Sequence, residues 1–204
     1  PVDDWELDIV ASGSQKGYMI PPGLSFVSMS KKAWQASENS NLPKFYLNLK
    51  SYKKSLSSNS NPYTPAVNLV FALDESLRMM KDEGLDKIFK RHEKHKVAVS
   101  EAIKTLNLKL FADEKHLSPA VTAIQIEGID AEHFRKTIKN KYDILLAGGQ
   151  DHLKGKIFRV GHLGYINDRD IIAVIAAIGN TLVEQNIIST EKAGEALKIA
   201  SCHL

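Results

Sequence analysis

The chain has 204 residues, 43% of them apolar and 25% charged, a composition that excludes a disordered protein and allows one large or two small domains. Its 27 basic and 24 acidic side chains are interleaved and give a net charge of +3, which argues against nucleic acid as the main partner. No apolar run reaches the ~20 residues of a membrane span, and the acidic first ten residues are not typical of a signal peptide.

The cysteine content and the first residue bear on the setting of the chain. Cys202 is the only cysteine, so no internal disulfide can form, and we expect a reducing, cytoplasmic location. The chain begins at Pro1 and enters core-like sequence at once, which we interpret as the middle of a longer protein.

The first part of the chain predicts two strands followed by a polar excursion. Residues 7–12 and 24–30 have strand-like patterns, and the Pro-Pro-Gly sequence at 21–23 predicts a turn between them. Ser30 is the expected cap of a short helix. The polar, Ser- and Asn-rich segment 37–62 predicts a long surface excursion that contains one short helix.

The rest of the chain alternates helices and strands. An apolar stripe after Pro65 predicts a helix that stops at Gly84. Asn167 is the expected cap of a later helix, with Asp170 placed to support it. The order is typical of helices packed on one face of a small sheet. The predicted elements are a helix at 86–107, a strand at 120–127, a helix at 130–140, strands at 143–147 and 156–161, and a helix at 168–185.

One lysine stands in an unusual setting. Lys16 follows the first predicted strand in SGSQKGYMIPPG and lies between small residues ahead of the turn. This setting favours an amine held still and partly removed from water, as Schiff-base chemistry requires. The glycine spacing of a phosphate-binding loop is absent, which excludes that role. An ordinary ion pair stays open, and it is the commoner role among 27 basic residues.

Three segments resemble the class V, fold-type I aminotransferases that use pyridoxal 5′-phosphate, especially the alanine–glyoxylate and serine–pyruvate members. SGSQKGYMIPPGLSFVSMS is similar to the family's lysine segment, PYTPAVNLVFALDESLRMMKDEGLDKIFKRHEKH to its threonine–proline helix start, and LLAGGQDHLKGKIFRVGHLG to its arginine strand. The resemblance runs in order over nearly all of residues 1–187. It implies an α/β fold with the end of the large cofactor domain at 1–84 and a complete α+β small domain at 85–204.

The resemblance also implies roles for single residues around pyridoxal phosphate. Lys16 corresponds to the lysine that forms the Schiff base and later carries the proton, and Gln15 would hydrogen-bond the cofactor phosphate. Thr64 would reach across a homodimer interface to the phosphate bound by the partner subunit. Some members carry an aromatic residue three positions before this threonine, whereas this chain has Asn61, and Tyr63 is the expected substitute for that contact.

The substrate contact implied by the resemblance is Arg159, which would hold an α-carboxylate with its bidentate fork. The alternative is an exposed ion pair on an edge strand, but the apolar neighbours Phe158 and Val160 favour a buried setting. The implied reaction moves an amino group between a small amino acid (alanine, serine or aspartate) and a 2-oxo acid such as glyoxylate or pyruvate.

The histidines offer weaker candidates for a site. His92 and His95 have a spacing compatible with a metal, but no acidic or cysteine partner set lies nearby in the sequence, so we expect a solvated helix face and no metal site. His162 lies close to Arg159 in the sequence and could touch substrate, although a packed structural histidine is favoured.

The resemblance begins after several functional segments of the family. Those segments hold the acidic partner of the pyridine nitrogen, the glycine-containing phosphate loop and the aromatic residue stacked on the ring. We therefore expect the C-terminal half of a transaminase, inactive alone, with the missing N-terminal half as a partner. A non-catalytic dimerisation or interaction module is the alternative. Similar sequences are labelled the small subunit of a soluble hydrogenase, but one cysteine cannot supply the ligands of such a metal centre.

Overall fold

The computed structural model describes residues 1–204, which form two compact units, Pro1–Met79 (unit 1) and Met80–Leu204 (unit 2). The division between the two units falls inside a helix. Both units mix helices and strands, in agreement with the α/β class expected from the sequence. None of the helices combines the length and apolar character needed to cross a bilayer.

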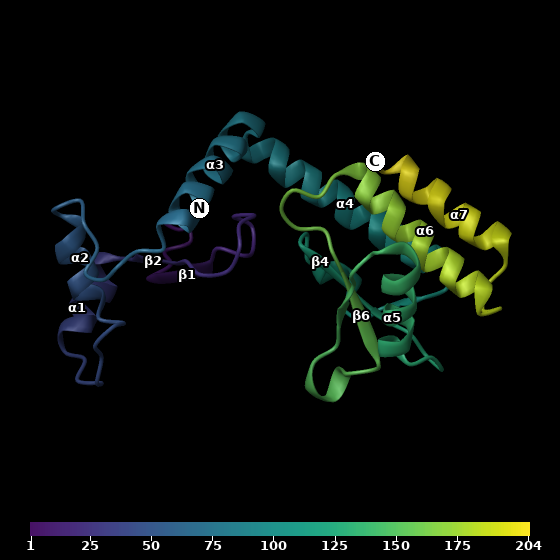
Figure 1. Cartoon of the computed structure of the whole chain (residues 1–204), viewed down its shortest axis with the longest axis horizontal. Helices are drawn as coiled ribbons and strands as arrows, with labels where there is room; N and C mark the ends of the chain where they lie inside the picture. Colours follow the sequence, from purple (N-terminus) through teal and green to yellow (C-terminus); the bar gives the residue numbers. More distant parts are fainter. The chain divides into compact units, whose positions relative to one another are not determined.

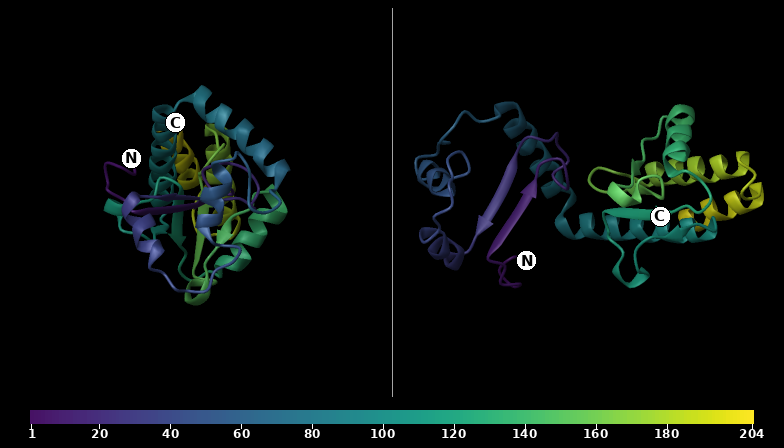
Figure 2. Two further views of the ribbon diagram at one scale, coloured as in Figure 1. Left: turned by 90° about the vertical axis from the view of Figure 1, so that its left-hand side faces the viewer. Right: turned by 90° about the horizontal axis from the view of Figure 1, so that it is seen from below.

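Unit 1 is built on an antiparallel hairpin (Figure 2), in which Ile9 lies opposite Met29 and Gly13 opposite Ser25. Ser30 caps the following helix, because its hydroxyl accepts from the amide of Ala33, as predicted. The polar excursion contains one short helix, also as predicted. The elements are β1 (Ile9–Gly13), β2 (Ser25–Met29), α1 (Lys31–Glu38), α2 (Leu49–Leu56) and α3 (Val67–Glu83), whose last residues belong to unit 2.

Unit 2 is a four-stranded antiparallel sheet with helices packed against it (Figure 1). The strand order is β3-β4-β6-β5, α4 and α5 contact strands, and α7 packs against α4 and α6. Its elements are α4 (Leu85–Thr105), β3 (Lys109–Leu110), η1 (Glu114–His116), β4 (Val121–Gln125), α5 (Ala131–Tyr142), β5 (Ala147–Gly148), η2 (Asp151–Leu153), β6 (Ile157–Gly161), α6 (Asp168–Glu184) and α7 (Thr190–Cys202).

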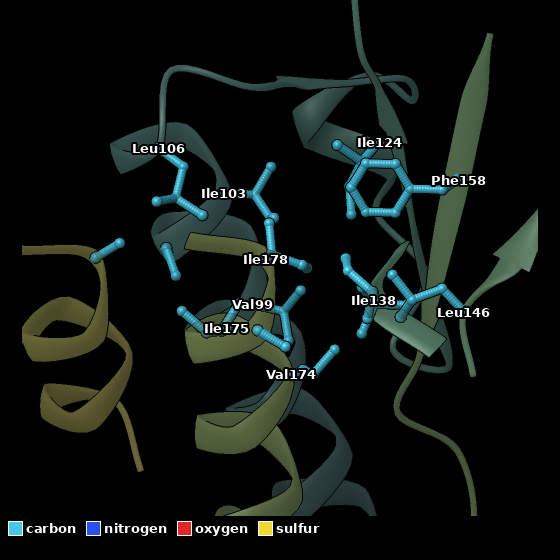
Figure 3. Packing of buried hydrophobic residues seen from close by; sticks show 14 of the residues in the cluster. Val99, Ile103, Leu106, Ile124, Ile138, Leu146, Phe158, Val174, Ile175 and Ile178 are labelled. Carbon is cyan, nitrogen blue, oxygen red and sulfur yellow. The ribbon is translucent and has the colours of Figure 1, made fainter. Parts of the chain in front are cut away.

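A single apolar core joins the sheet of unit 2 to its helices. Figure 3 shows Ile103 of α4 and Ile178 of α6 pointing toward Ile124 and Phe158 of the sheet, and all four are fully buried. The ring of Phe158 also packs on Phe134 of α5, with 5.3 Å between centroids. Because side chains alternate along a strand, this packing fixes β6 from one face and places Ile157 and Arg159 on the other.

Two of the elements that differ from the sequence-based prediction have a clear local cause. The strand expected at 143–147 is shorter, because α5 continues to Tyr142 and Asp143 ends it in a left-handed conformation with φ 54°. The carbonyl of Leu146 then accepts from Arg135 Nε instead of from a strand. Helix α7 was not predicted, because the residues it buries fully are alanines, which give a weak apolar stripe.

Candidate functional site

Ser14 makes the hydrogen bonds that close the loop carrying Lys16. It is fully buried, and its hydroxyl donates to the carbonyl of Pro21 at 2.8 Å and accepts from the amide of Leu24 at 3.1 Å. Its backbone amide and carbonyl bond to Leu24 and Ile20. One small polar side chain therefore closes the segment 14–24, which we call the lysine loop. Sequence reasoning missed Ser14, since only its place among small residues marked it.

Helix α3 holds the lysine loop from a second side. Ser76, buried on α3, donates its hydroxyl proton to the carbonyl of Tyr18 at 2.5 Å. Gly23 has φ 142°, a backbone conformation that favours glycine, and a Cβ there would lie 2.5 Å from Leu69 Cδ1, the end of a side chain on α3. The loop is thus tied to the hairpin and to α3 by bonds that do not involve Lys16.

Lys16 itself is exposed, which corrects the expectation of a partly buried amine. The reason is that β1 and β2 form a two-stranded sheet with no third strand beside the loop. Lys16 forms a turn through its backbone, which accepts from Met19 and donates to Gly13, and no carboxylate pairs with its amine. Gln15 folds back over Gly13, where a Cβ would lie 2.7 Å from its Oε1. A fixed backbone thus presents a free amine next to an amide.

The two residues ahead of α3 that were predicted to contact the phosphate, Tyr63 and Thr64, differ in their surroundings. Thr64 is exposed, and its hydroxyl makes no hydrogen bond in this chain. Tyr63 is half-buried, and its hydroxyl donates to the carbonyl of Phe45 at 3.1 Å. Its ring stacks on Tyr46 with 4.6 Å between centroids. A phosphate contact at Tyr63 would need the single proton that Phe45 now receives.

Arg159 lies on the face of β6 that is opposite to Phe158. It is half-buried, and two small residues, Ala123 of β4 and Ala147 of β5, lie directly beside it in the sheet. Its Nε donates to the carbonyl of Gly148 at 2.9 Å. The small neighbours leave space along the guanidinium, and its two terminal nitrogens have no partner in the chain.

The absence of an acidic partner separates Arg159 from the other half-buried arginines of the chain. Arg91 is paired with Glu83 and Arg135 with Glu132, at 2.6 and 2.7 Å. No carboxylate pairs with Arg159. A half-buried guanidinium without a counter-ion is costly, which makes this position suited to an incoming anion.

The histidines of α4 correct another expectation. His95 is fully buried rather than solvated, and its Nε2 lies 2.9 Å from Asp168 Oδ1. Burial lowers the pKa of His95. Hydrogen bonds from the Lys94 ammonium, the larger cause, and from His95 lower the pKa of the Asp168 carboxyl. His92 is half-buried and accepts from the amide of Gly164 at 3.1 Å. His92 thus binds the segment between β6 and α6, and His95 binds the first residue of α6, contacts that the periodicity of α4 does not reveal.

His162 is a packed structural residue, as favoured from the sequence. Its ring is fully buried, with Nε2 2.9 Å from Thr122 Oγ1 and Nδ1 3.0 Å from the carbonyl of Pro119. Burial is the main cause that lowers the pKa of His162 to about 4. A neutral ring can donate from Nδ1 and accept at Nε2, so it satisfies both contacts at once.

A family model and several individual proteins resemble this chain. The model of the family described as aminotransferase class-V matches residues 1–163. The small subunit of a soluble hydrogenase from Synechococcus sp. (strain PCC 6716) is 54% identical over 184 residues, 90% of this chain and 48% of that protein. Serine–glyoxylate aminotransferase from Methylorubrum extorquens is 33% identical over 201 residues, 95% of this chain and 50% of that protein.

Solved structures agree in fold. The ureidoglycine–glyoxylate aminotransferase of Bacillus subtilis superposes with a TM-score of 0.88 at 29% identity, covering 98% of this chain and 54% of that one. The chain thus spans about half the length of the curated relatives and solved structures that it matches. The matched family region includes the lysine loop, α3 and β6.

Proposed function

Because the chain belongs to the class-V aminotransferase family, we propose that the protein carrying it is a pyridoxal phosphate-dependent transaminase. The observation that carries the proposal is Arg159, a half-buried guanidinium that has two free terminal nitrogens and no acidic partner. An α-carboxylate supplies two coplanar oxygens that match this fork, and it is present in both an amino acid and a 2-oxo acid.

The donor set of the lysine loop fits the cofactor. Pyridoxal phosphate presents an aldehyde, which a primary amine can attack, and a phosphate, which neutral donors and cations can bind. Lys16 supplies an amine without an ionic partner, and Gln15 supplies an amide beside it. We assign the Schiff-base role to Lys16 and phosphate contacts to Gln15 and Thr64. The bound cofactor supplies an electron sink for the electrons of the breaking Cα–H bond.

The residues of this chain have distinct tasks in that reaction. Arg159 orients the amino acid through its carboxylate, so that the Cα proton has a fixed direction. The Lys16 amine accepts this proton and returns it, a task that requires the rigid backbone that Ser14 and Ser76 provide. A phosphate contact of Tyr63 requires its hydroxyl to give up the hydrogen bond to the carbonyl of Phe45.

We propose glyoxylate as the acceptor and alanine, serine or aspartate as the donor. Support comes from two relatives whose names include glyoxylate, a serine–glyoxylate and a ureidoglycine–glyoxylate aminotransferase. Transfer of the amino group to glyoxylate gives glycine, and the donor leaves as its 2-oxo acid. We further propose a homodimer in which Thr64 serves the cofactor phosphate of the partner subunit.

The cofactor role is tested by borohydride reduction of the protein after addition of pyridoxal phosphate, followed by peptide mapping. We expect one added group per chain, on Lys16, and loss of that label in Lys16→Arg. Lys31→Arg is the matched control, since Lys31 is also exposed but lies at the start of α1. A label spread over several lysines, or retained in Lys16→Arg, would refute the assignment.

The reaction itself is tested with ¹⁵N-labelled donors and unlabelled glyoxylate. Transamination predicts ¹⁵N-glycine, detected by mass spectrometry, with alanine, serine or aspartate as the source of label. Arg159→Ala should raise the half-saturating donor concentration about 30-fold or more, as for a charge-assisted pair that loses one partner, while borohydride labelling of Lys16 persists. Unchanged donor binding in Arg159→Ala would contradict the carboxylate role.

A further inference from the structure

The peptide between Gly148 and Gly149 is held from both sides by β6. Its N–H, on Gly149, donates to the carbonyl of Ile157 at 3.1 Å. Its carbonyl, on Gly148, accepts from Arg159 Nε at 2.9 Å. One rigid peptide plane therefore joins the end of β5 to the backbone of β6 and to the guanidinium that β6 carries.

The bond at Nε determines which arginine donors remain free. A guanidinium has five N–H groups in one plane, so a bond at Nε fixes the rotation of the whole plane. The four N–H groups on the terminal nitrogens of Arg159 stay unpaired in this chain, and these are the groups that form a two-pronged contact with a carboxylate. The carbonyl of Gly148 thus restricts the side chain without occupying the binding end.

A side chain would meet different obstacles at the two ends of this peptide. A Cβ at Gly149 would lie 2.1 Å from the carbonyl oxygen of Leu153, which is backbone and cannot turn aside. A Cβ at Gly148 would lie 2.5 Å from Glu132 Oε1 and 2.6 Å from Arg135 Nη1, the ends of flexible side chains. A substitution at Gly149 must therefore move the peptide, whereas one at Gly148 can be accommodated by the Glu132–Arg135 pair.

We infer that the Gly148–Gly149 peptide is a positioning element for Arg159, which sets the guanidinium plane for a bound carboxylate. The inference rests on the carboxylate-binding role proposed above. It assigns to Gly149 a requirement that is independent of overall stability, because the glycine keeps the acceptor carbonyl in place. Gly149→Ala should leave Arg159 present but free to rotate.

The hydrogen bond is tested by NMR of the protein labelled with ¹⁵N-arginine, whose Arg159 Nε–H signal is assigned by its loss in Arg159→Lys. We expect slow solvent exchange of this proton in the wild type and fast exchange in Gly149→Ala. Gly148→Ala should retain protection, and Gly194→Ala is the control, since a Cβ there meets nothing within 4 Å. Fast exchange in the wild type would overturn the inference without the need for any variant.

The consequence for binding is measured with glyoxylate as the probe, from the shift of the same Nε signal. Gly149→Ala should bind glyoxylate about tenfold more weakly than the wild type, since a misoriented fork loses one of two charge-assisted bonds. Equal affinity in the two proteins overturns the positioning role while the carboxylate role of Arg159 stands. Absence of glyoxylate binding in the wild type instead overturns the proposed carboxylate role, and the positioning role with it.

Discussion

Acidification should destabilise unit 2 through His162, and the size of the effect follows from its burial. In the unfolded chain the ring takes a proton near its ordinary pKa of 6.5, whereas in the fold it stays neutral until pH falls to about 4. The unfolded state therefore binds more protons between these values. The contribution of His162 is fully present above pH 6.5 and is lost as pH falls toward 4, for a total of about 3 kcal/mol.

The perturbation that isolates this contribution is His162→Gln, which keeps one donor and one acceptor but cannot be protonated. His95, whose pKa is also lowered by burial, acts in the same direction and is present in both proteins. The difference in unfolding free energy between wild type and variant should therefore shrink by about 2 kcal/mol between pH 7 and pH 5. His133→Gln, which removes an exposed ring on α5, is the matched control.

The assay must report on unit 2 alone. Both tryptophans, Trp5 and Trp34, lie in unit 1, so tryptophan fluorescence does not follow the relevant transition. Hydrogen exchange of β6 amides, analysed by mass spectrometry and corrected for intrinsic rates, gives the opening free energy of the strand next to His162. A difference between wild type and His162→Gln that stays constant from pH 7 to pH 5 would show that the native ring is not held neutral.

Three further predictions address the core, the lysine loop and the dimer. Phe158→Ala removes a fully buried ring and should lower the opening free energy of β6, measured by hydrogen exchange, by about 3–5 kcal/mol. The unfolding of unit 1, followed by tryptophan fluorescence, should not change; a loss of stability in both units would contradict this. Ser14→Ala should lower the unfolding free energy of unit 1 by about 1–3 kcal/mol, because it leaves the half-buried amide of Leu24 without its acceptor. It should also speed exchange within 14–24, whereas Ser58→Ala, at an exposed site, should not. Mixtures of Lys16→Ala and Thr64→Ala proteins should regain activity up to about one quarter of the wild-type sites if each site uses both subunits of a symmetric dimer; no gain over the separate variants would exclude that arrangement.

Local signals in the sequence were sufficient for much of the fold. The cap at Asn167 was predicted because the whole capping box, including Asp170, lies within four residues, and the structure confirms it. Helix α7 lacked such a signal on its buried face, where Ala193, Ala196 and Ala200 differ little from an exposed stripe. Propensity and periodicity therefore predict elements best where large apolar side chains mark the buried face.

Contacts between distant segments limited the prediction of the site. The partners of His92 and His95 are Gly164 and the first residue of α6, more than 60 residues away, so their own helix alone suggested a solvated face. The bond between Arg159 and the Gly148 carbonyl joins a side chain to a backbone atom, which leaves no residue type to recognise in the sequence. The roles of Lys16, Gln15, Thr64, Tyr63 and Arg159 came from the resemblance and stay predictions.

The hairpin of unit 1 has a consequence for how this chain, prepared by itself, behaves at high concentration. Strands β1 and β2 pair only with each other, so each has an outer row of unpaired amides and carbonyls. Ile9 and Val27 lie on these strands with exposed fractions of 61% and 46%. Open edges with apolar side chains add strands from neighbouring molecules and can seed fibrils. Storage of this chain should therefore be limited by slow, concentration-dependent aggregation that starts in the hairpin, even while the core of unit 2 remains folded.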